Sequence, residues 1–353
     1  MELPIIAGIQ QIGIGVANAE EAWTWYRKHF DMNIPIFKDK ATASLMTRYT
    51  NNVAEDRFAI LAINGQGGGG FEIWQYTSKT PEPNKEEIAL GDTGVYAIKM
   101  KSRNVEKSYS HFRDHGIDTP GGLQTSPDGR KHFFVKDPYG NLFQVINGNS
   151  WLKKNKSHSG GVSGCVIGVS DIAKALPLYQ SVLGYKEIIY DETGIFSDFN
   201  GLSGDQQKYR RVLLSSNSKR WGAFSRLLGH TELELVEIIG EQPKKIFEGR
   251  NWGDLGFIHV CFDVHGMAQL GTKCASHNFP FTVDSSNSFD MGKAAGHFSY
   301  CEDPDGTLIE FVETHKIPIM EKWGWYLNLK NRNPLKPLPD WMFSMLGLAK
   351  VKN

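Results

Sequence analysis

Hydrophobic and polar residues alternate along this chain in a pattern that occurs four times. Each copy begins with an apolar run typical of a strand, continues with an amphipathic stretch of helical period, and then returns to strand-like runs. The first runs cover residues 11–16, 94–100, 164–169 and 256–264, and the amphipathic stretches lie at about 19–30, 105–115, 171–184 and 267–276. Because one helix accompanies several strands in each copy, the pattern predicts an α+β fold of four βαβββ modules.

The second and fourth copies close in nearly the same way. Copy two contains Asp137-Pro-Tyr-Gly140 and copy four contains Asp303-Pro-Asp-Gly306, and each is followed by an apolar strand that carries one amide or acid. Proline at the second position and glycine at the fourth are typical of a type I turn. One such turn is weak evidence, but two copies with matching strands support the repeat.

A polar stretch rich in Gly, Ser and Lys divides the four copies into two halves. We expect an N-terminal domain at residues 1–148 with modules one and two, a linker at 149–162, and a C-terminal domain at 163–315 with modules three and four. Residues 316–353 break the repeat. We expect them to dock as a tail that ends in a short helix, with a lid over a pocket as the alternative.

Composition mainly excludes classes of partner and location. Lys plus Arg and Asp plus Glu number 39 each, so the formal net charge is zero, and no basic run suggests nucleic acid or an anionic membrane as a partner. The N-terminus lacks the regions of a signal peptide, no apolar run is long enough to span a bilayer, and the four cysteines form no Cys-x-x-Cys pair. We expect a cytoplasmic protein whose partner is a small molecule.

The modules resemble those of the vicinal oxygen chelate superfamily, which includes glyoxalase I, bleomycin-resistance proteins and type I extradiol dioxygenases. The similarity covers about residues 5–315. It is most specific in copy four, in the segments Gly256-Phe-Ile-His-Val-Cys-Phe-Asp-Val264 and Asp303-Pro-Asp-Gly-Thr-Leu-Ile-Glu-Phe311. The resemblance implies two glyoxalase-like domains with curled sheets around a pocket, and a divalent metal held by the first and last strands of the modules.

The resemblance also implies two ligand positions in each copy, which transfer to this chain residue by residue. They are Gln11 and Glu72 in copy one, Ala97 and Gln144 in copy two, Gly164 and Glu234 in copy three, and His259 and Glu310 in copy four. Ala97 and Gly164 cannot bind a metal through a side chain. The inner copies have therefore lost part of the family pattern.

The pairing of the modules decides the ligand set, and the sequence leaves two arrangements open. If modules pair within each half, as the resemblance to extradiol dioxygenases implies, the metal site holds Glu234, His259 and Glu310. If the outer modules pair, as fused glyoxalase I chains imply, it holds Gln11, Glu72, His259 and Glu310, and the inner pair is inactive. His259 and Glu310 belong to both sets.

The ligand types indicate the chemistry. Imidazole together with carboxylate and amide oxygens suits Fe, Mn, Ni, Co or Zn. Such an ion can bind two neighbouring substrate oxygens and stabilise an enolate as a Lewis acid, with Glu72 or Glu234 as the candidate base. Tyr300, in the pattern Tyr-x-x-Asp-Pro-x-Gly-x-x-x-Glu, resembles the tyrosine of the dioxygenase signature that contacts substrate, and His230 is a further acid–base candidate.

We therefore expect a metal-dependent enzyme, a lyase or isomerase with glyoxalase-like chemistry on a small molecule with vicinal oxygens. One alternative is an Fe(II) ring-cleaving dioxygenase of the extradiol type, although its second histidine would have to stand at Gly164. The other alternative is a metal-free protein that binds a small molecule. The substrate, the identity of the metal and the oligomeric state, with a homodimer as one option, stay open.

Overall fold

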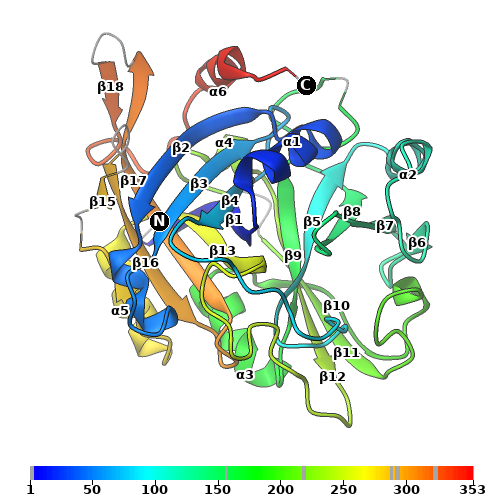
Figure 1. Cartoon of the computed structure of the whole chain (residues 1–353). Helices are drawn as coiled ribbons and strands as arrows, with labels where there is room; N and C mark the ends of the chain where they lie inside the picture. The colour runs from blue at the N-terminus through cyan, green and yellow to red at the C-terminus, as the bar shows by residue number, and fades with distance from the viewer. Residues whose placement is uncertain are drawn as a thin grey trace.

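The computed structural model describes residues 4–155, 157–216, 220–286, 289–290, 295–320 and 325–352. Within these ranges the strands form two curled sheets that lie side by side, one with ten strands and one with eight (Figure 1). We call them the outer sheet and the inner sheet, because the first contains modules one and four and the second contains modules two and three.

The outer sheet joins the two ends of the chain. Its main path is β14 (Val283–Asp284), β16 (Ala295–Glu302), β17 (Leu308–Met320), β13 (Gly256–His265), β1 (Ile5–Gly15), β4 (Gly70–Tyr76), β3 (Asp56–Ile63) and β2 (Ile34–Thr42). In addition, β15 (Phe289–Asp290) pairs with β16, and β18 (Trp325–Asn328) pairs with β17. Blue strands therefore lie beside yellow and orange strands in Figure 1.

The inner sheet is made from the middle of the chain, and its strands are cyan and green in Figure 1. Its path is β10 (Glu187–Gly194), β11 (Tyr209–Ser215), β12 (Glu232–Ile238), β9 (Val162–Gly168), β5 (Gly94–Ser102), β8 (Leu142–Asn147), β7 (Lys131–Lys136) and β6 (Gln124–Thr125).

Both sheets have the same centre. The first strands of two modules pair antiparallel, β1 with β13 in the outer sheet and β5 with β9 in the inner sheet. Each first strand also pairs in parallel with the last strand of its own module: β4, β17, β8 or β12. Of the two arrangements that the sequence leaves open, the structure has the one in which the outer modules pair. Each half of the chain contributes one module to each sheet, and the expected domain boundaries at 148 and 163 stay a prediction.

Each module contributes one main helix: α1 (Ala19–Phe30), α2 (Val105–Asp114), α3 (Ile172–Leu176) or α5 (Met267–Ser276). The remaining helical segments are η1 (Ser44–Tyr49), η2 (Pro177–Val182), η3 (Ser197–Phe199), α4 (Ser225–Leu228), α6 (Asp340–Leu346) and η5 (Gly347–Ala349). One continuous hydrophobic core joins both sheets to the four module helices, through Tyr26, Phe112, Ile172 and Leu270 among others. The α+β class and the four βαβββ modules are confirmed.

The C-terminal segment packs against the outer sheet. Leu329, Leu338 and Phe343 are buried in a cluster with residues of β1, β2 and β3. The segment is also held by an ion pair between Arg226 of α4 and Asp340 of α6, 2.7 Å apart. Because β17 continues to Met320, the first residues of the expected tail extend a strand rather than leave the sheet.

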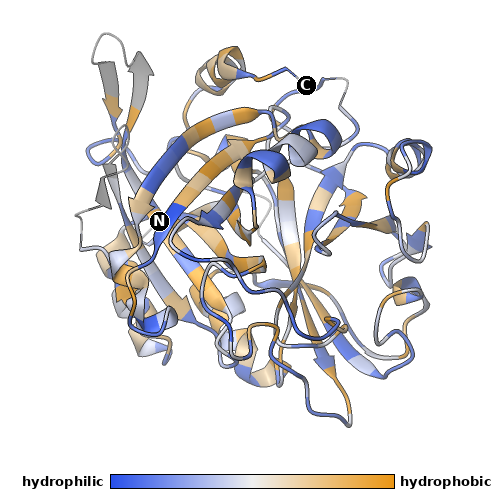
Figure 2. Cartoon of the chain, viewed as in Figure 1, coloured by the Kyte–Doolittle hydropathy of each residue, from blue (hydrophilic) through white to orange (hydrophobic). Residues whose placement is uncertain are grey.

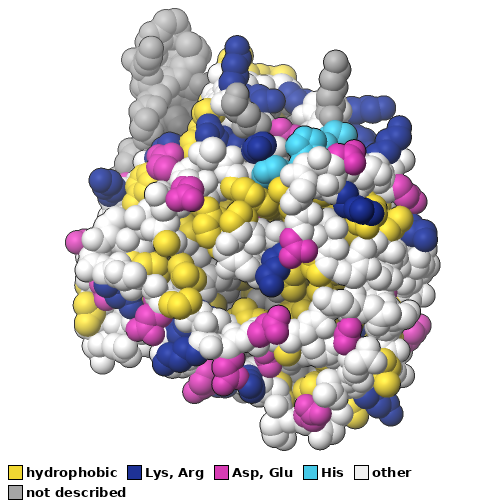
Figure 3. Space-filling model, turned by 45° about the vertical axis from the view of Figure 1, so that its right-hand side comes forward, with side chains coloured by type: hydrophobic (Ala, Val, Ile, Leu, Met, Phe, Trp, Pro, Cys, Tyr) yellow, Lys and Arg dark blue, Asp and Glu magenta, His cyan; other side chains and the backbone are white. Residues whose placement is uncertain are grey.

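Hydropathy follows the secondary structure (Figure 2), and both signs of charge occur on the face shown in Figure 3. In Figure 2 hydrophobic residues are concentrated on the strands and on helix faces, while many loops are hydrophilic. On the face shown in Figure 3, positive and negative side chains are interspersed, and histidines gather in one patch. Three histidines form a ring cluster: His111 stacks on His158 with ring centroids 4.0 Å apart, and the ring of His115 lies 4.2 Å from that of His111. No helix of the described ranges has the length and apolar character needed to cross a membrane.

Candidate metal centre

The four central strands of the outer sheet bring together the polar residues Gln11 (β1), Glu72 (β4), His259 (β13) and Glu310 (β17). The Nε2 atom of His259 lies 3.0 Å from Oε2 of Glu310 and 3.4 Å from Oε2 of Glu72. The side-chain amide of Gln11 donates a hydrogen bond of 3.1 Å to Oε2 of Glu72. One candidate ligand atom from each of Glu72, His259 and Glu310 lies within 4.8 Å of the other two.

Strand register explains why these side chains share one face of the sheet. Gly13 lies opposite His259 on β13 and opposite Glu72 on β4, while Cys261 lies opposite Gln11 and Glu310. Residues that face each other across neighbouring strands point to the same side of a sheet, as do residues two apart on one strand. The two modules therefore place their ligand positions around an approximate two-fold axis between β1 and β13.

Gly13 makes room for the imidazole of His259. A Cβ atom at position 13 would lie 2.4 Å from Cε1 of His259 and 2.7 Å from each ring nitrogen. No side chain tolerates such a distance. The histidine ring thus lies directly over the backbone of β1.

Burial makes the charges of this site depend on one another. His259 is fully buried and Glu310 is 7 % exposed, whereas the side chain of Glu72 retains 13 %. Burial lowers the pKa of His259, but the carboxylates of Glu310 and Glu72 outweigh it and raise that pKa to about 10. Burial raises the pKa of Glu310, and the neighbouring His259 brings it below its usual range. A proton on His259 thus balances one of the two carboxylates, and one negative charge remains.

The donor set fits a divalent metal ion. Nε2 of His259 and Oε2 of Glu310 are both buried, and neither has a hydrogen bond of acceptable geometry within the described ranges. The two atoms form an ion pair of 3.0 Å with each other, and a metal ion would bind both. Replacing the imidazole proton by a divalent cation would also bring the formal charge of two carboxylates and one neutral histidine to zero.

Tyr300 of β16 completes the surroundings of His259. Its hydroxyl lies 3.4 Å from Nδ1 of His259, and the two rings meet edge to face with centroids 5.6 Å apart. Burial, followed by the charges of Glu310 and Glu72, raises the pKa of Tyr300 well above its usual value, so the phenol keeps its proton. A partner on Nδ1 orients a histidine whose Nε2 binds a metal.

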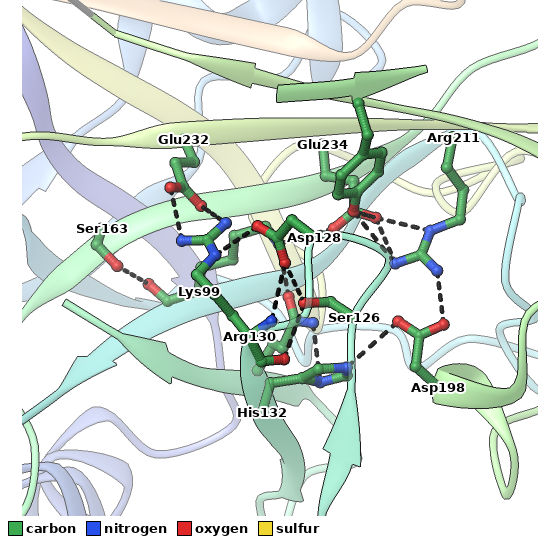
Figure 4. A network of polar contacts seen from close by, with 12 residues as sticks. Lys99, Ser126, Asp128, Arg130, His132, Ser163, Asp198, Arg211, Glu232 and Glu234 are labelled. Atoms are coloured by element: carbon green, nitrogen blue, oxygen red, sulfur yellow. Dashed lines mark hydrogen bonds and ion pairs between the residues drawn. The ribbon is translucent and has the colours of Figure 1, made fainter. Parts of the chain in front are cut away.

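The inner sheet has a lysine among the residues that correspond to the metal ligands of the outer sheet. The register makes Ala97, Gln144, Gly164 and Glu234 the counterparts of Gln11, Glu72, His259 and Glu310. Lys99 stands at the position of Gly13, and its ammonium donates hydrogen bonds of 2.7 Å to Gln144 and to Glu234 (Figure 4). Its stem lies 3.2 Å from where a Cβ of Gly164 would be. The inner sheet therefore carries its own cation.

Glu234 is fully engaged in the inner sheet. It forms an ion pair of 2.7 Å with Arg211 in addition to Lys99, and it accepts a hydrogen bond of 2.8 Å from the hydroxyl of Tyr190. Burial raises the pKa of Glu234, but Arg211 and then Lys99 hold it far below its usual range. The network in Figure 4 continues from Arg211 to Asp198. Because its pKa is so low, the carboxylate of Glu234 is a poor base.

The structure thus brings together five of the seven expected site residues and leaves two apart. Gln11, Glu72, His259, Glu310 and Tyr300 form the centre described above. Glu234 lies in the other sheet. His230 precedes β12 and contacts the hydroxyl of Ser215 at 2.8 Å, also in the inner sheet. Sequence reasoning missed Lys99, although a lysine inside the apolar run of residues 94–100 was a visible signal.

The similarity to known proteins agrees with this geometry. Residues 8–145 and 161–311 match the Glyoxalase/Bleomycin resistance protein/Dioxygenase superfamily, and the chain belongs to this superfamily. No curated protein shows significant sequence similarity to it.

Solved structures share the arrangement of the whole chain. A "putative dioxygenase" from Bacillus subtilis subsp. subtilis str. 168 superimposes with a TM-score of 0.56 at 14 % identity, over 88 % of this chain and 86 % of that one. A mutant of glyoxalase I from Zea mays gives a TM-score of 0.53 at 12 % identity, over 88 % and 92 %. At these identities the likeness concerns the fold alone.

Proposed function

We propose that this protein is a metal-dependent enzyme, a lyase or isomerase that acts on a small molecule with two neighbouring oxygens. The observation that carries the proposal is the cluster of Glu72, His259 and Glu310, in which His259 and Glu310 are buried and the candidate ligand atoms lie within 4.8 Å of one another. Clusters of this kind, set on rigid central strands, are suited to hold an ion and a substrate in a fixed geometry.

The side chains that would hold the ion are His259 through Nε2, Glu310 and Glu72 through their carboxylates, and Gln11 through its amide oxygen. This mixture of nitrogen and oxygen ligands suits Fe, Mn, Ni, Co or Zn. When bound, such an ion supplies Lewis-acid stabilisation of negative charge on substrate oxygens. A single histidine departs from the two histidines and one carboxylate of non-haem Fe(II) oxygenases, which favours the lyase or isomerase chemistry.

Glu72 is the residue placed to move a proton. It is the more exposed of the two carboxylates, with 13 % of its side chain accessible against 9 % for Glu310. Among the residues that the structure describes, Gln11 and His259 contact Glu72 through Oε2. The other oxygen can accept a proton from a carbon next to a substrate carbonyl. Tyr300, which remains protonated, keeps His259 in place.

The first test is the metal content of the purified protein by elemental analysis. We expect one ion per chain in the wild type and its loss in His259→Ala and in Glu310→Ala. The matched control is Gln144→Ala, which changes the inner-sheet counterpart of Glu72 and should leave the metal in place. A wild type that stays metal-free after reconstitution with Fe(II), Mn, Ni, Co and Zn would contradict the proposal and favour a metal-free binding protein.

The second test concerns proton transfer. The metal-loaded protein should exchange the carbon-bound protons of hydroxyacetone, a simple α-hydroxyketone, for deuterium in D₂O, as followed by proton NMR. Glu72→Gln should retain the metal and lose at least about 100-fold in rate, the usual contribution of a positioned base. Oxygen consumption with catechols, without such exchange, would instead support the ring-cleaving dioxygenase.

A further inference from the structure

A cavity of about 320 Å³ lies at one end of the outer sheet, next to the first residues of β5 in the inner sheet. It is bounded by η1, by the loop of residues 245–252, and by the first residues of β5, β13 and β17. None of Gln11, Glu72, His259 and Glu310 lines it. Its volume falls in the range of small-molecule sites.

The walls of this cavity combine aromatic rings with an excess of positive charge. Tyr49, Phe247 and Trp252 contribute rings. The cationic residues are Arg48, Lys245 and Arg250. Arg48 pairs with Glu302 at 3.6 Å, so the surplus comes from Lys245 and Arg250. The wall has one carboxylate, Asp305, which accepts a hydrogen bond from the backbone N–H of Ser170. Aromatic walls favour an apolar ligand body, and a surplus of cations favours an anionic group on it.

Two of the cationic side chains differ in how firmly they are held. The guanidinium of Arg250 donates hydrogen bonds of 2.7 Å and 2.6 Å to the carbonyls of Leu255 and Ile246, which fixes it in the wall. Lys245 is exposed and has no ion pair among the residues that the structure describes. A ligand carboxylate would therefore gain a mobile partner in Lys245 beside a preorganised one in Arg250.

Unsatisfied hydrogen-bond donors also belong to this wall. Trp252 is 8 % exposed, and its indole N–H has no acceptor within the described ranges. The same holds for Nε of Arg250. Both donor atoms are buried within the wall and do not face the open volume of the cavity, so the ligand preference rests on the rings and the cations.

We propose that this cavity binds a small organic anion with an aromatic body, of the class of aromatic carboxylates, at a site separate from the metal. The inference does not depend on the proposed function, because the walls contain no candidate metal ligand. A carboxylate would meet the cations, and the ring would lie against the aromatic residues.

The test uses 4-fluorobenzoate, titrated into the full-length protein and followed by fluorine NMR, with uncharged 4-fluorobenzyl alcohol as the matched ligand. We expect saturable binding of the carboxylate with a Kd on the order of 1 mM, the level expected for so small a ligand. The alcohol should bind at least about tenfold more weakly, and added salt should weaken only the carboxylate. Absence of saturable carboxylate binding, or equal binding of the alcohol, would overturn the proposal.

Two neighbouring lysines provide matched variants. Lys245 lines the cavity, whereas Lys244 does not and pairs with Glu86. Both are exposed, so neither substitution threatens folding. Lys245→Met should weaken carboxylate binding about tenfold, the effect of losing one charge-assisted contact, and Lys244→Met should leave it unchanged. Equal effects of the two substitutions would contradict the assignment of the site.

His259→Ala separates this proposal from the metal chemistry. Binding of 4-fluorobenzoate that persists in this variant, with or without metal, supports an independent site. Binding that is lost together with the metal would place the ligand at the metal centre and overturn the inference. Failure of the wild type to bind any metal would contradict the proposed function alone.

Discussion

At the scale of single residues, a missing side chain at Gly13 creates the space for His259. A methyl group there would lie 2.4 Å from the imidazole, so Gly13→Ala should push the ring away from Glu72 and Glu310. We expect metal affinity to fall about 10–100-fold, as for other changes that misplace a ligand. Metal titration followed by elemental analysis checks this. Gly194→Ala is the control, because nothing lies within 4 Å of that position, and unchanged affinity in Gly13→Ala would contradict the geometry.

The buried side chain of Lys101 should make the free energy of unfolding depend on pH. Lys101 is 1 % exposed, and burial, followed by the charge of Arg103, lowers its pKa to about 7. Between pH 7 and 10 the unfolded chain still binds this proton while the folded protein does not, so the free energy of unfolding should rise with pH in that window. At pH 7, Lys101→Met should be more stable than the wild type by roughly 3 kcal/mol.

Urea unfolding at pH 7, 8.5 and 10 checks this prediction. The difference between Lys101→Met and the wild type should shrink as the pH rises, because keeping the folded-state lysine neutral costs less as the pH approaches the pKa of the unfolded chain. The hydrogen bond of 2.9 Å from Lys101 to the carbonyl of Ser150 is also lost in the variant, which limits the gain. Lys107→Met, at an exposed position, should leave the slope unchanged. A difference that is constant with pH would show that Lys101 is charged in the folded protein.

Most of the candidate centre is accessible from the sequence at this scale. The resemblance to the vicinal oxygen chelate superfamily indicates Gln11, Glu72, His259 and Glu310, because it implies two ligand positions in each module. Lys99 is not predicted in the same way. Its surroundings depend on Gly164 of a strand more than 60 residues away, where a Cβ atom would lie 2.0 Å from the carbonyl oxygen of Glu232 and 3.2 Å from the Lys99 side chain. A lysine whose surroundings are set by a residue of another strand depends on tertiary contact, and no local sequence pattern predicts it.

At the scale of elements, the apolar pattern predicts helices well and edge strands poorly. The expected helices at 19–30 and 267–276 coincide with α1 and α5. The third differs, since α3 ends at Leu176 and continues as a π-helical turn from Pro177, whose ring removes a backbone donor and crowds the preceding turn. The edge strand β2 escapes notice because its outer positions are polar, as in Lys38-Asp-Lys40.

The C-terminal helix offers a test of how the tail contributes to stability. On α6, Phe343 is 6 % exposed and packs against the ring of Phe224, while Trp341 on the same helix is 58 % exposed. Phe343→Ala should lower the free energy of unfolding by about 3 kcal/mol, and Trp341→Ala should change it by less than about 0.5 kcal/mol. Urea denaturation compares the two. Equal effects would mean that the tail is not docked through this face.

At the scale of the whole molecule, the sequence could not decide how the modules pair, because all four first strands are similarly apolar. The strand register of β1 with β13 and of β5 with β9 gives a physical reason why the outer modules pair with each other. In the observed pairing His259 faces Gly13, and Lys99 faces Gly164, so each large side chain lies over a glycine. The same register applied within the C-terminal half would set His259 opposite Val166, where a branched side chain would occupy the space of the ring.

This pairing predicts the behaviour of a divided chain. A cut after Lys153, at an exposed position in the linker, gives fragments 1–153 and 154–353. Each fragment lacks one partner of both central strand pairs, β1 with β13 and β5 with β9. Neither fragment alone should bind metal, whereas the co-expressed fragments should purify as a one-to-one complex with the metal content of the intact protein. His259→Ala in the second fragment should abolish the metal without separating the two. Stoichiometric metal in the isolated fragment 154–353 would instead require a site of Glu234, His259 and Glu310, and would refute the pairing of the outer modules.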